Sequence, residues 1–358
     1  MSKNSALEKF RKLSGNEYGF MMNEEDNPYK VKEWLDTGCY ILNAALSNGD
    51  LFKGLPLGKR IVISGEPGVA KSLFTMYIIK AYLEQIPDAN VIFFESEGSS
   101  VMEMAENLKL PQDRILVLPV GNITDFNSQA TKILNEIKNE HKKEKTKTRY
   151  IMCLDSLSMM HSKREYNNAL EGNEAKDMSK AGDIRGVFRN ITLDLSLTET
   201  PMIITNHVYE NIGGYGNQKK QSGGNGVVYA GDIIFVLTKA KEKEGDERVG
   251  SQITLNISKS RFQREDSKYK ILLLYSKGVY KYSGLMEYAL KYEIWKKEGH
   301  SIVVDENRKV KKSTIFKNPE EFFTEQVLNQ INENLIKDVG FGDTGEEFFH
   351  DEIDKDED

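Results

Sequence analysis

The chain has 358 residues, of which 39% are apolar and 29% are charged, and its formal net charge is −6. This composition is typical of a globular protein with one large core domain and smaller attachments, and it excludes a fibrous or low-complexity chain. The negative net charge excludes a protein that is basic over its whole surface, so any nucleic-acid site must be a local basic patch.

Signals of secretion, membrane insertion and metal binding by cysteine are missing from the sequence. No apolar run approaches the length of a membrane span, and the first ten residues contain no signal-peptide apolar region. Cys39 and Cys153 are far apart and have no metal-ligand spacing. We therefore expect buried free thiols in a cytoplasmic protein that does not contact a membrane.

The first 34 residues are polar, with a thin apolar stripe at Leu7, Phe10 and Leu13. The spacing of three predicts one short amphipathic helix. So narrow a stripe cannot form a core of its own. The segment is therefore either an arm that docks on the core or on a neighbouring subunit, or a disordered terminus.

Residues 64–72 form the clearest motif of the chain, S-G-E-P-G-V-A-K-S, between an apolar strand at 60–63 and a helical apolar pattern from Leu73 to Ile79. This is the context of a phosphate-binding loop, in which backbone N–H groups and a helix N-terminus face phosphate oxygens. Ala70 stands where the common pattern has a second glycine. The alternative is a turn that binds nothing, which would leave Lys-Ser without a packing role. The predicted ATP-binding residues are Gly65, Glu66, Pro67, Gly68, Val69, Ala70, Lys71 and Ser72.

Side chains for the phosphates and for Mg²⁺ follow from this motif. Lys71 is expected to reach the β- and γ-phosphates, and the Ser72 hydroxyl is expected to ligate Mg²⁺. A later apolar strand, 150–157, reads Y-I-M-C-L-D-S-L and supplies Asp155 as a second Mg²⁺ residue, acting through water. Strand 91–94 ends in E-S-E-G, and carboxylates at a strand's carboxyl end lie beside the ligand crevice of an open α/β sheet.

The remaining pattern alternates apolar strands with amphipathic helices, which predicts an α/β fold with a mostly parallel central sheet and helices on both faces. Two stretches, 161–176 and 209–226, are polar or glycine-rich and are expected to be irregular loops. The further expected strands are 114–119, 201–206, 233–238, 253–258 and 271–275; the expected helices are 126–137, 177–197, 285–292 and 319–336; a small hairpin is expected at 302–304 and 309–311.

The ordered motifs resemble those of the RecA-like recombinases, and most closely the phage UvsX branch. They are the phosphate loop, E-S-E-G, L-D-S, T-N-H at 205–207, G-G-N at 223–225 and K-S-R at 259–261. The resemblance begins near Leu35 and extends to the C-terminus. It implies a RecA-like P-loop NTPase core at 35–283, an N-terminal segment at 1–34, a small C-terminal α/β domain at 284–340 and an acidic disordered tail at 341–358.

The resemblance also implies catalytic roles. Glu97 matches the glutamate that activates the attacking water, and His207 matches a sensor of the γ-phosphate, although from the residues alone His207 reads as a core histidine. Lys259 and Arg261 match a basic pair that reaches the ATP of an adjacent protomer. No tyrosine is evident for stacking on adenine, and Thr254 and Asn256 replace a basic pair that RecA uses for a second DNA strand.

DNA is expected to contact two loops, 162–176 and 209–224, which match the DNA-binding loops of the family. Basic side chains and glycine-rich backbone amides can meet phosphates there, while an apolar or aromatic residue wedges between bases. Tyr229 matches an aromatic residue at the subunit interface. The candidate DNA-binding residues are Arg185, Arg189, Ile212, Tyr215, Lys219, Lys220, Gly223, Gly224 and Asn225.

The expected function is an ATP- and Mg²⁺-dependent strand-exchange protein that forms helical filaments on single-stranded DNA, pairs it with homologous duplex and hydrolyses ATP between protomers. Single-strand-binding and mediator proteins are expected partners, in the bacterial host cytoplasm if the source is a phage. The alternatives are a hexameric helicase motor of RecA fold and a non-catalytic ATP-gated scaffold. The acidic tail either competes with DNA for the basic loops, binds a basic accessory protein or serves solubility.

Overall fold

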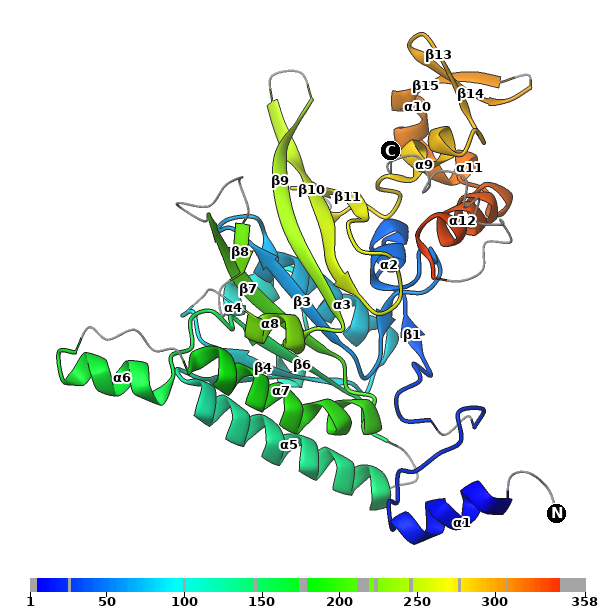
Figure 1. Ribbon diagram of the computed structural model, residues 1–358. Helices are drawn as coiled ribbons and strands as arrows, with labels where there is room; N and C mark the ends of the chain where they lie inside the picture. Colours follow the sequence, from blue (N-terminus) through cyan, green and yellow to red (C-terminus); the bar gives the residue numbers. More distant parts are fainter. Residues whose placement is uncertain are drawn as a thin grey trace, which may run out of the picture.

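The computed structural model describes residues 5–24, 27–98, 101–143, 147–173, 179–210, 219–221, 225–244, 247–275, 278–306 and 308–341 (Figure 1). The acidic tail beyond residue 341 lies outside these ranges. Within them, no helix is both long enough and apolar enough to cross a membrane. Cys39 and Cys153 are buried free thiols, as expected.

Six parallel strands form the centre of the molecule, in the spatial order β5-β4-β6-β7-β3-β9. The chain extends this sheet with antiparallel strands: β10, β11 and β12 follow β9, and β8 pairs with β7. The mostly parallel α/β sheet predicted from sequence is confirmed. The bounds are β3 Arg60–Gly65, β4 Asn90–Glu95, β5 Ile115–Pro119, β6 Tyr150–Asp155, β7 Met202–Glu210, β8 Lys219–Gln221, β9 Ile233–Glu244, β10 Glu247–Ser260, β11 Lys268–Leu274 and β12 Gly278–Val279.

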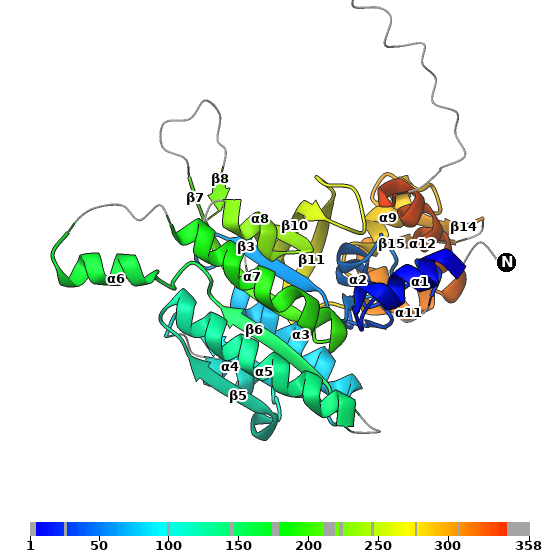
Figure 2. The same cartoon turned by 60° about the horizontal axis from the view of Figure 1, so that its bottom comes forward.

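Helices cover both faces of the parallel sheet, which is why its central strands are continuous apolar runs rather than alternating ones. On β3, Ile61 and Ile63 pack in the core that contains α3, whereas Val62 packs in the core that contains α5 and α7. Helices α5 and α7 lie side by side in both views (Figures 1 and 2). The bounds are α3 Lys71–Gln85, α4 Val101–Asn107, α5 Ile123–Lys143, α7 Lys180–Leu197 and α8 Asn225–Ala230.

The N-terminal stripe forms the predicted helix, α1 (Ser5–Ser14), and its apolar side chains are exposed: 53% for Leu7, 63% for Phe10 and 72% for Leu13. This helix therefore does not bury its stripe on its own core. The chain then adds a two-stranded ribbon and one buried helix before the central sheet begins. These are β1 Trp34–Leu35, which pairs with β2 Leu55–Pro56, and α2 Tyr40–Leu46.

After β12 the chain forms a smaller group of helices around a three-stranded antiparallel sheet, beside α2 in Figure 1. The predicted hairpin is thus two strands of a three-stranded sheet. The elements of this C-terminal group are α9 Leu285–Lys291, β13 Lys296–Glu298, β14 Ser301–Asp305, β15 Arg308–Lys311, α10 Lys312–Lys317, α11 Pro319–Phe322 and α12 Glu325–Val339.

Four sequence expectations on secondary structure were wrong. The stretch 209–226 was expected to be irregular, but β7 continues to Glu210, β8 pairs with its end, and α8 begins at Asn225. Residues 163–170 form a helix, α6 (Lys163–Leu170), because Ser162 and Glu165 make reciprocal capping hydrogen bonds at its start. The closing helix is divided into α11 and α12, since Thr324 caps a new helix by accepting from the backbone of Val327. The strand expected from residue 114 starts at Ile115, because Arg114 ends a short 3₁₀ turn, Gln112–Arg114.

Candidate functional site: a nucleotide-binding half-site at each end of the sheet

The predicted phosphate loop joins the end of β3 to the start of α3. Gly68 and Ala70 both adopt left-handed backbone conformations, each with φ of 76°. A residue with a Cβ atom pays about 1–2 kcal/mol for this conformation, and this explains why glycine is common at the position that Ala70 occupies. Ala70 nevertheless adopts this conformation at the N-terminal end of α3, as glycine would at the same position.

Lys71 begins α3 and is 6% exposed. Its Nζ donates to the carbonyl oxygens of Gly65 at 3.1 Å and Glu66 at 3.0 Å, and lies 3.5 Å from Nδ1 of His207. Burial lowers the pKa of Lys71, while the nearby carboxylates of Glu97 and Asp155 act in the opposite direction. The ammonium thus lies inside the loop, where the phosphates of a nucleotide would be held.

Asp155 ends β6 and is completely buried. Thr205 donates a hydrogen bond to its Oδ1, while Oδ2 has no hydrogen-bond partner among the described residues. Burial raises the pKa of Asp155, against the effect of the Thr205 and Ser72 hydroxyls. A buried carboxylate oxygen with spare capacity, near a serine hydroxyl, fits a hard cation such as Mg²⁺. Among the described residues no group of three His, Cys, Asp or Glu side chains could hold a metal alone.

Glu97 and His207 meet although 110 residues separate them. His207 Nε2 and Glu97 Oε1 are 2.8 Å apart, and the Glu97 backbone N–H donates to Oε1 of Glu95 at 2.9 Å. His207 reaches this place because β7 pairs with β3 in a register that sets it beside Gly65 at the loop. Lys71, His207 and Glu97 therefore form one contiguous polar row across three elements.

A cleft of about 570 Å³ opens beside the phosphate loop, between α3, the end of α4 and the antiparallel strands. Its lining includes Ala70 and Leu73 of the loop and α3, together with Lys239, whose Nζ donates to the carbonyl of Gly68 at 2.9 Å. Tyr275, 61% exposed, also lines it. Such a volume suits a nucleoside. Sequence analysis missed this tyrosine, because only the pairing of β11 through β10 and β9 to β3 brings it to the loop.

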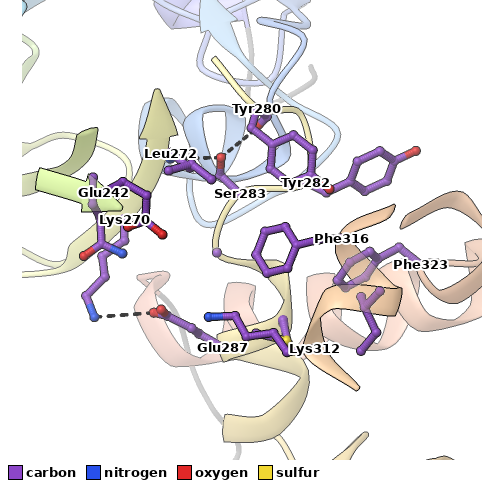
Figure 3. Close-up of a pocket in the computed structure, with 14 residues that line it drawn as sticks. Glu242, Lys270, Leu272, Tyr280, Tyr282, Ser283, Glu287, Lys312, Phe316 and Phe323 are labelled. Carbon is purple, nitrogen blue, oxygen red and sulfur yellow. Dashed lines mark hydrogen bonds and ion pairs between the residues drawn. The ribbon is translucent and has the colours of Figure 1, made fainter. Parts of the chain in front are cut away.

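A second cavity, shown in Figure 3, lies between β11 and the C-terminal helices. Its aromatic walls are stacked pairs: Tyr280 with Phe316 at 5.8 Å, and Tyr282 with Phe323 at 5.7 Å between ring centroids. Its enclosed space, about 60 Å³, is far too small for a nucleotide. None of its lining residues belongs to the phosphate loop, β4, β6 or β7. We interpret it as the packing joint that holds the C-terminal group of elements on the sheet.

The other predicted catalytic residues lie at the opposite end of the sheet, in a group that we name the basic edge cluster: Lys59, Arg60, Lys259 and Arg261. Lys259 pairs with Ile234 near the start of β9, and the Arg261 backbone N–H donates to the Asp232 carbonyl at 3.1 Å. Because β3 runs from Arg60 at this end to Gly65 at the loop, about 16 Å separates the two ends. Lys259 and Arg261 therefore do not lie beside Lys71 within one protomer.

Comparisons with known proteins decide the family. The family model described as the RecA N-terminal domain matches residues 2–280, more than half of the chain. The chain belongs to the RecA family. It is 28% identical over 263 residues to the recombination and repair protein of Enterobacteria phage T4, a match that covers 74% of this chain and 65% of that protein, or less than two thirds of its length.

The matches to two bacterial relatives cover a larger share of the relative's own length. The RecA protein of Mycoplasmopsis pulmonis is 25% identical over 301 residues, with 82% of each chain covered. The RecA protein of a Nitratiruptor species is 23% identical over 338 residues, with 91% of this chain and 90% of that protein covered. The resemblance to the RecA-like recombinases and to their phage branch is thus confirmed, together with the fold class.

In this RecA-family chain, the candidate DNA residues are only partly described. Arg185 and Arg189 are exposed and lie one turn apart on α7. The Arg185 guanidinium lies 5.8 Å from the ring centroid of Tyr229, a residue of α8. Lys219 and Lys220 lie in β8, and Asn225 is the first residue of α8. Ile212, Tyr215, Gly223 and Gly224 lie outside the described residues.

Proposed function

We propose that this protein is an ATP-dependent recombinase that forms helical filaments on single-stranded DNA and exchanges strands with homologous duplex. The observation that supports the proposal is that the candidate nucleotide residues lie in two groups, one at each end of the parallel strands. The phosphate loop, Asp155, Glu97 and His207 lie at one end of the sheet, and Lys259 and Arg261 at the other. Head-to-tail contact between protomers would bring the two halves together, and such contacts generate helical filaments when they do not close into rings.

At the loop end, each residue has a part in hydrolysis. Lys71 and the loop amides hold the β- and γ-phosphates, while Ser72 and Asp155 would hold Mg²⁺, which neutralises developing charge on the phosphates. Glu97 orients the attacking water. Its contact with His207 lets the histidine sense whether a γ-phosphate is present, since both lie in one row with Lys71. The nucleoside occupies the neighbouring cleft, with its base against Tyr275.

At the other end, Lys259 and Arg261 act on the nucleotide of a neighbouring protomer. A cation supplied in this way is worth on the order of 10³–10⁵ in rate in GTPases. A protomer by itself lacks this half, so an isolated protomer is expected to be nearly inactive. The exposed stripe of α1 is the candidate docking arm between protomers, because its own core does not cover it.

DNA binds along α7, β8 and α8, at the end of the core from which α6 projects in both views (Figure 2). Contacts of Arg185 and Arg189 with phosphates predict weak sequence preference and strong salt dependence. His207 precedes the second DNA loop on β7, so the nucleotide can influence the order of that loop. Accessory single-strand-binding and mediator proteins would then act on the same filament, in the cytoplasm.

Arg189→Ala tests the DNA face. Removing one phosphate contact should reduce the slope of log affinity against log salt by roughly 0.7 on single strands. Fluorescence anisotropy with a labelled oligonucleotide measures this slope between low and high salt. Lys297→Ala, at an exposed position of β13 rather than on α7, is the comparison variant for a general charge effect. An unchanged slope for Arg189→Ala would remove this residue from the interface.

ATP hydrolysis with and without single-stranded DNA, over a range of protein concentrations, tests the whole proposal. Strong stimulation with a cooperative onset is expected, because DNA assembles the two halves of each site. Hydrolysis that ignores DNA would favour the hexameric motor or the scaffold. Electron microscopy separates these further, since a motor forms closed rings, and a scaffold would bind ATP without hydrolysing it.

A further inference from the structure

Asp232 lies at the centre of the basic edge cluster and is 5% exposed. Arg60 donates three hydrogen bonds to the Asp232 carboxylate: its backbone N–H and Nε donate to Oδ2 at 3.0 and 3.1 Å, and its Nη2 donates to Oδ1 at 3.1 Å. The same arginine is anchored at its far end, where Nη1 donates to the Thr192 hydroxyl at 2.6 Å. Asp232 therefore has a fixed position and orientation.

Arg261 contacts the same carboxylate. Its Nε lies 3.0 Å from Oδ1 of Asp232, the oxygen that also accepts from Arg60 Nη2, and its side chain is 63% exposed. The Nε edge of the guanidinium is thus held, and among the described residues no hydrogen bond is made by its two terminal nitrogens. Those nitrogens form the planar fork that binds two oxygens of one phosphate.

We propose that Asp232 is the positioning residue that aims Arg261 at the nucleotide of the neighbouring protomer, an inference that rests on the proposed function. A free guanidinium samples many rotamers, and an anchored Nε edge removes most of them before the phosphate arrives. Asp232 itself touches no reacting atom. Its contribution is the geometry of the guanidinium in the transition state.

Lys259 is held by a different device. Its Nζ donates to the carbonyl oxygens of Val228 at 2.7 Å and Gly231 at 2.9 Å, and no hydrogen bond to Asp232 is present among the described side chains. Loss of the Asp232 carboxylate should therefore act on catalysis through Arg261 and leave Lys259 in place. A purely structural role of the Asp232–Arg60 pair would instead affect folding and leave the chemical step unchanged.

Asp232→Asn is the main variant. Misplacement of a transition-state group by about 1 Å can cost on the order of 10²-fold, so we expect DNA-stimulated kcat to fall about 10- to 100-fold. KM for ATP should stay within about two-fold, because the lost contact belongs to the transition state. Asp194→Asn is the control: it removes the ion pair with Lys138, 2.7 Å long, between α5 and α7, and should leave kcat unchanged.

Mixing experiments separate this inference from the proposed function. Lys71→Ala protomers carry a dead loop but an intact basic edge cluster. Mixed with Arg261→Ala protomers, they should restore about a quarter of wild-type activity at equal amounts, if protomers join head-to-tail at random. Failure of that mixture would overturn the divided site, and this inference with it. If the first mixture restores ATP hydrolysis, the mixture of Lys71→Ala with Asp232→Asn protomers should restore it as well.

A double-mutant cycle decides whether Asp232 acts through Arg261. In the Arg261→Ala background, Asp232→Asn should lower kcat no further, whereas an equal additional loss would overturn the proposal. Wild-type kcat in folded Asp232→Asn would also overturn it. If Asp232→Asn does not fold, Arg261→Lys at the exposed site takes its place: it keeps the charge without the anchored fork, so full activity of Arg261→Lys would refute the proposed geometry.

Discussion

The two ends of the central sheet handle buried charge in opposite ways. At the loop end, Asp155 is completely buried with one carboxylate oxygen unpartnered among the described residues, and burial raises its pKa. At the other end, burial also opposes the charge of Asp232, but the guanidinium of Arg60 outweighs it, and the pKa of Asp232 is lowered. The Asp155 carboxylate thus keeps hydrogen-bonding capacity among the described residues, whereas both oxygens of Asp232 accept from Arg60.

This difference is what the proposed divided site requires. In that proposal, the end that would bind the nucleotide has spare hydrogen-bonding capacity, which a cation and phosphates could use. The end that would be offered to a neighbour must hold its geometry without the nucleotide, because it would act on the site of a different protomer. Substitutions at each end should therefore fail in different ways.

The largest effect is expected for Glu97→Gln. The amide cannot take up a proton from water, and general-base catalysis is typically worth about 10²–10⁴-fold. ATP affinity should remain close to wild type, because the residue acts on water rather than on the nucleotide. Single-turnover hydrolysis and nucleotide binding measure the two quantities. A matching loss of ATP affinity would show that Glu97 holds the nucleotide, and would break the assignment of the loop end.

Stability should change in opposite directions at the two aspartates. The pKa of Asp155 is raised in the folded protein. Its contribution to stability is therefore fully present at a pH below its pKa in the unfolded chain, and that contribution is lost as the pH rises through its pKa in the folded protein. Asp155→Asn should therefore raise the free energy of unfolding at pH 7, without nucleotide or Mg²⁺, by about 1–2 kcal/mol. Urea denaturation measures this, and a lower stability would contradict the spare capacity of Oδ2.

Asp232 has the reverse sign. Its lowered pKa contributes stability above the unfolded pKa, which is lost as pH falls through the folded value. Asp232→Asn should lower the free energy of unfolding at pH 7 by about 3 kcal/mol, because the variant leaves Arg60 buried without its counter-charge. The difference between variant and wild type should shrink in acid. A difference that is constant from pH 7 to pH 3 would contradict the ion-pair account.

Removing the Tyr275 ring should affect binding alone. Aromatic stacking on a base is worth about 1–3 kcal/mol, so Tyr275→Ala should raise KM for ATP by roughly ten-fold at little cost in kcat. Tyr275→Phe keeps the ring and should behave as wild type. If Tyr275→Phe raises KM for ATP as much as Tyr275→Ala does, the hydroxyl rather than stacking is responsible for the affinity, and the base is bound in another way.

The smallest effect belongs to Ala70→Gly. Glycine removes the strain of the left-handed backbone, but it also increases the entropy of the unfolded chain, so a net gain below about 1 kcal/mol is expected. Thermal unfolding measures it. A loss of stability would show that the methyl group of Ala70 packs in the loop strongly enough to offset its strain.

Local pattern was sufficient to predict the phosphate loop, the acidic strand ends and the parallel sheet. Each rests on a few neighbouring residues whose backbone conformation or strand edge is set nearby, as with S-G-E-P-G-V-A-K-S and L-D-S. The capped helix α6 was also accessible in principle, since Ser162 and Glu165 have the spacing of a capping box. It was overlooked because its polar sequence resembles a loop.

Tertiary structure alone decided which distant residues meet. The contact of His207 with Glu97 depends on the register of β7 against β3. The place of Tyr275 depends on two antiparallel pairings, of β10 with β9 and of β11 with β10. The contact of Arg261 with Asp232 depends on the antiparallel pairing by which β10 ends where β9 starts, at the edge where β3 begins with Arg60. The sequence by itself determined the family motifs and the elements that contain them. Only the folded sheet sets Lys71 and Glu97 at one end and Lys259 and Arg261 at the other, because strand register and crossover direction are properties of chain pairing that no short segment contains.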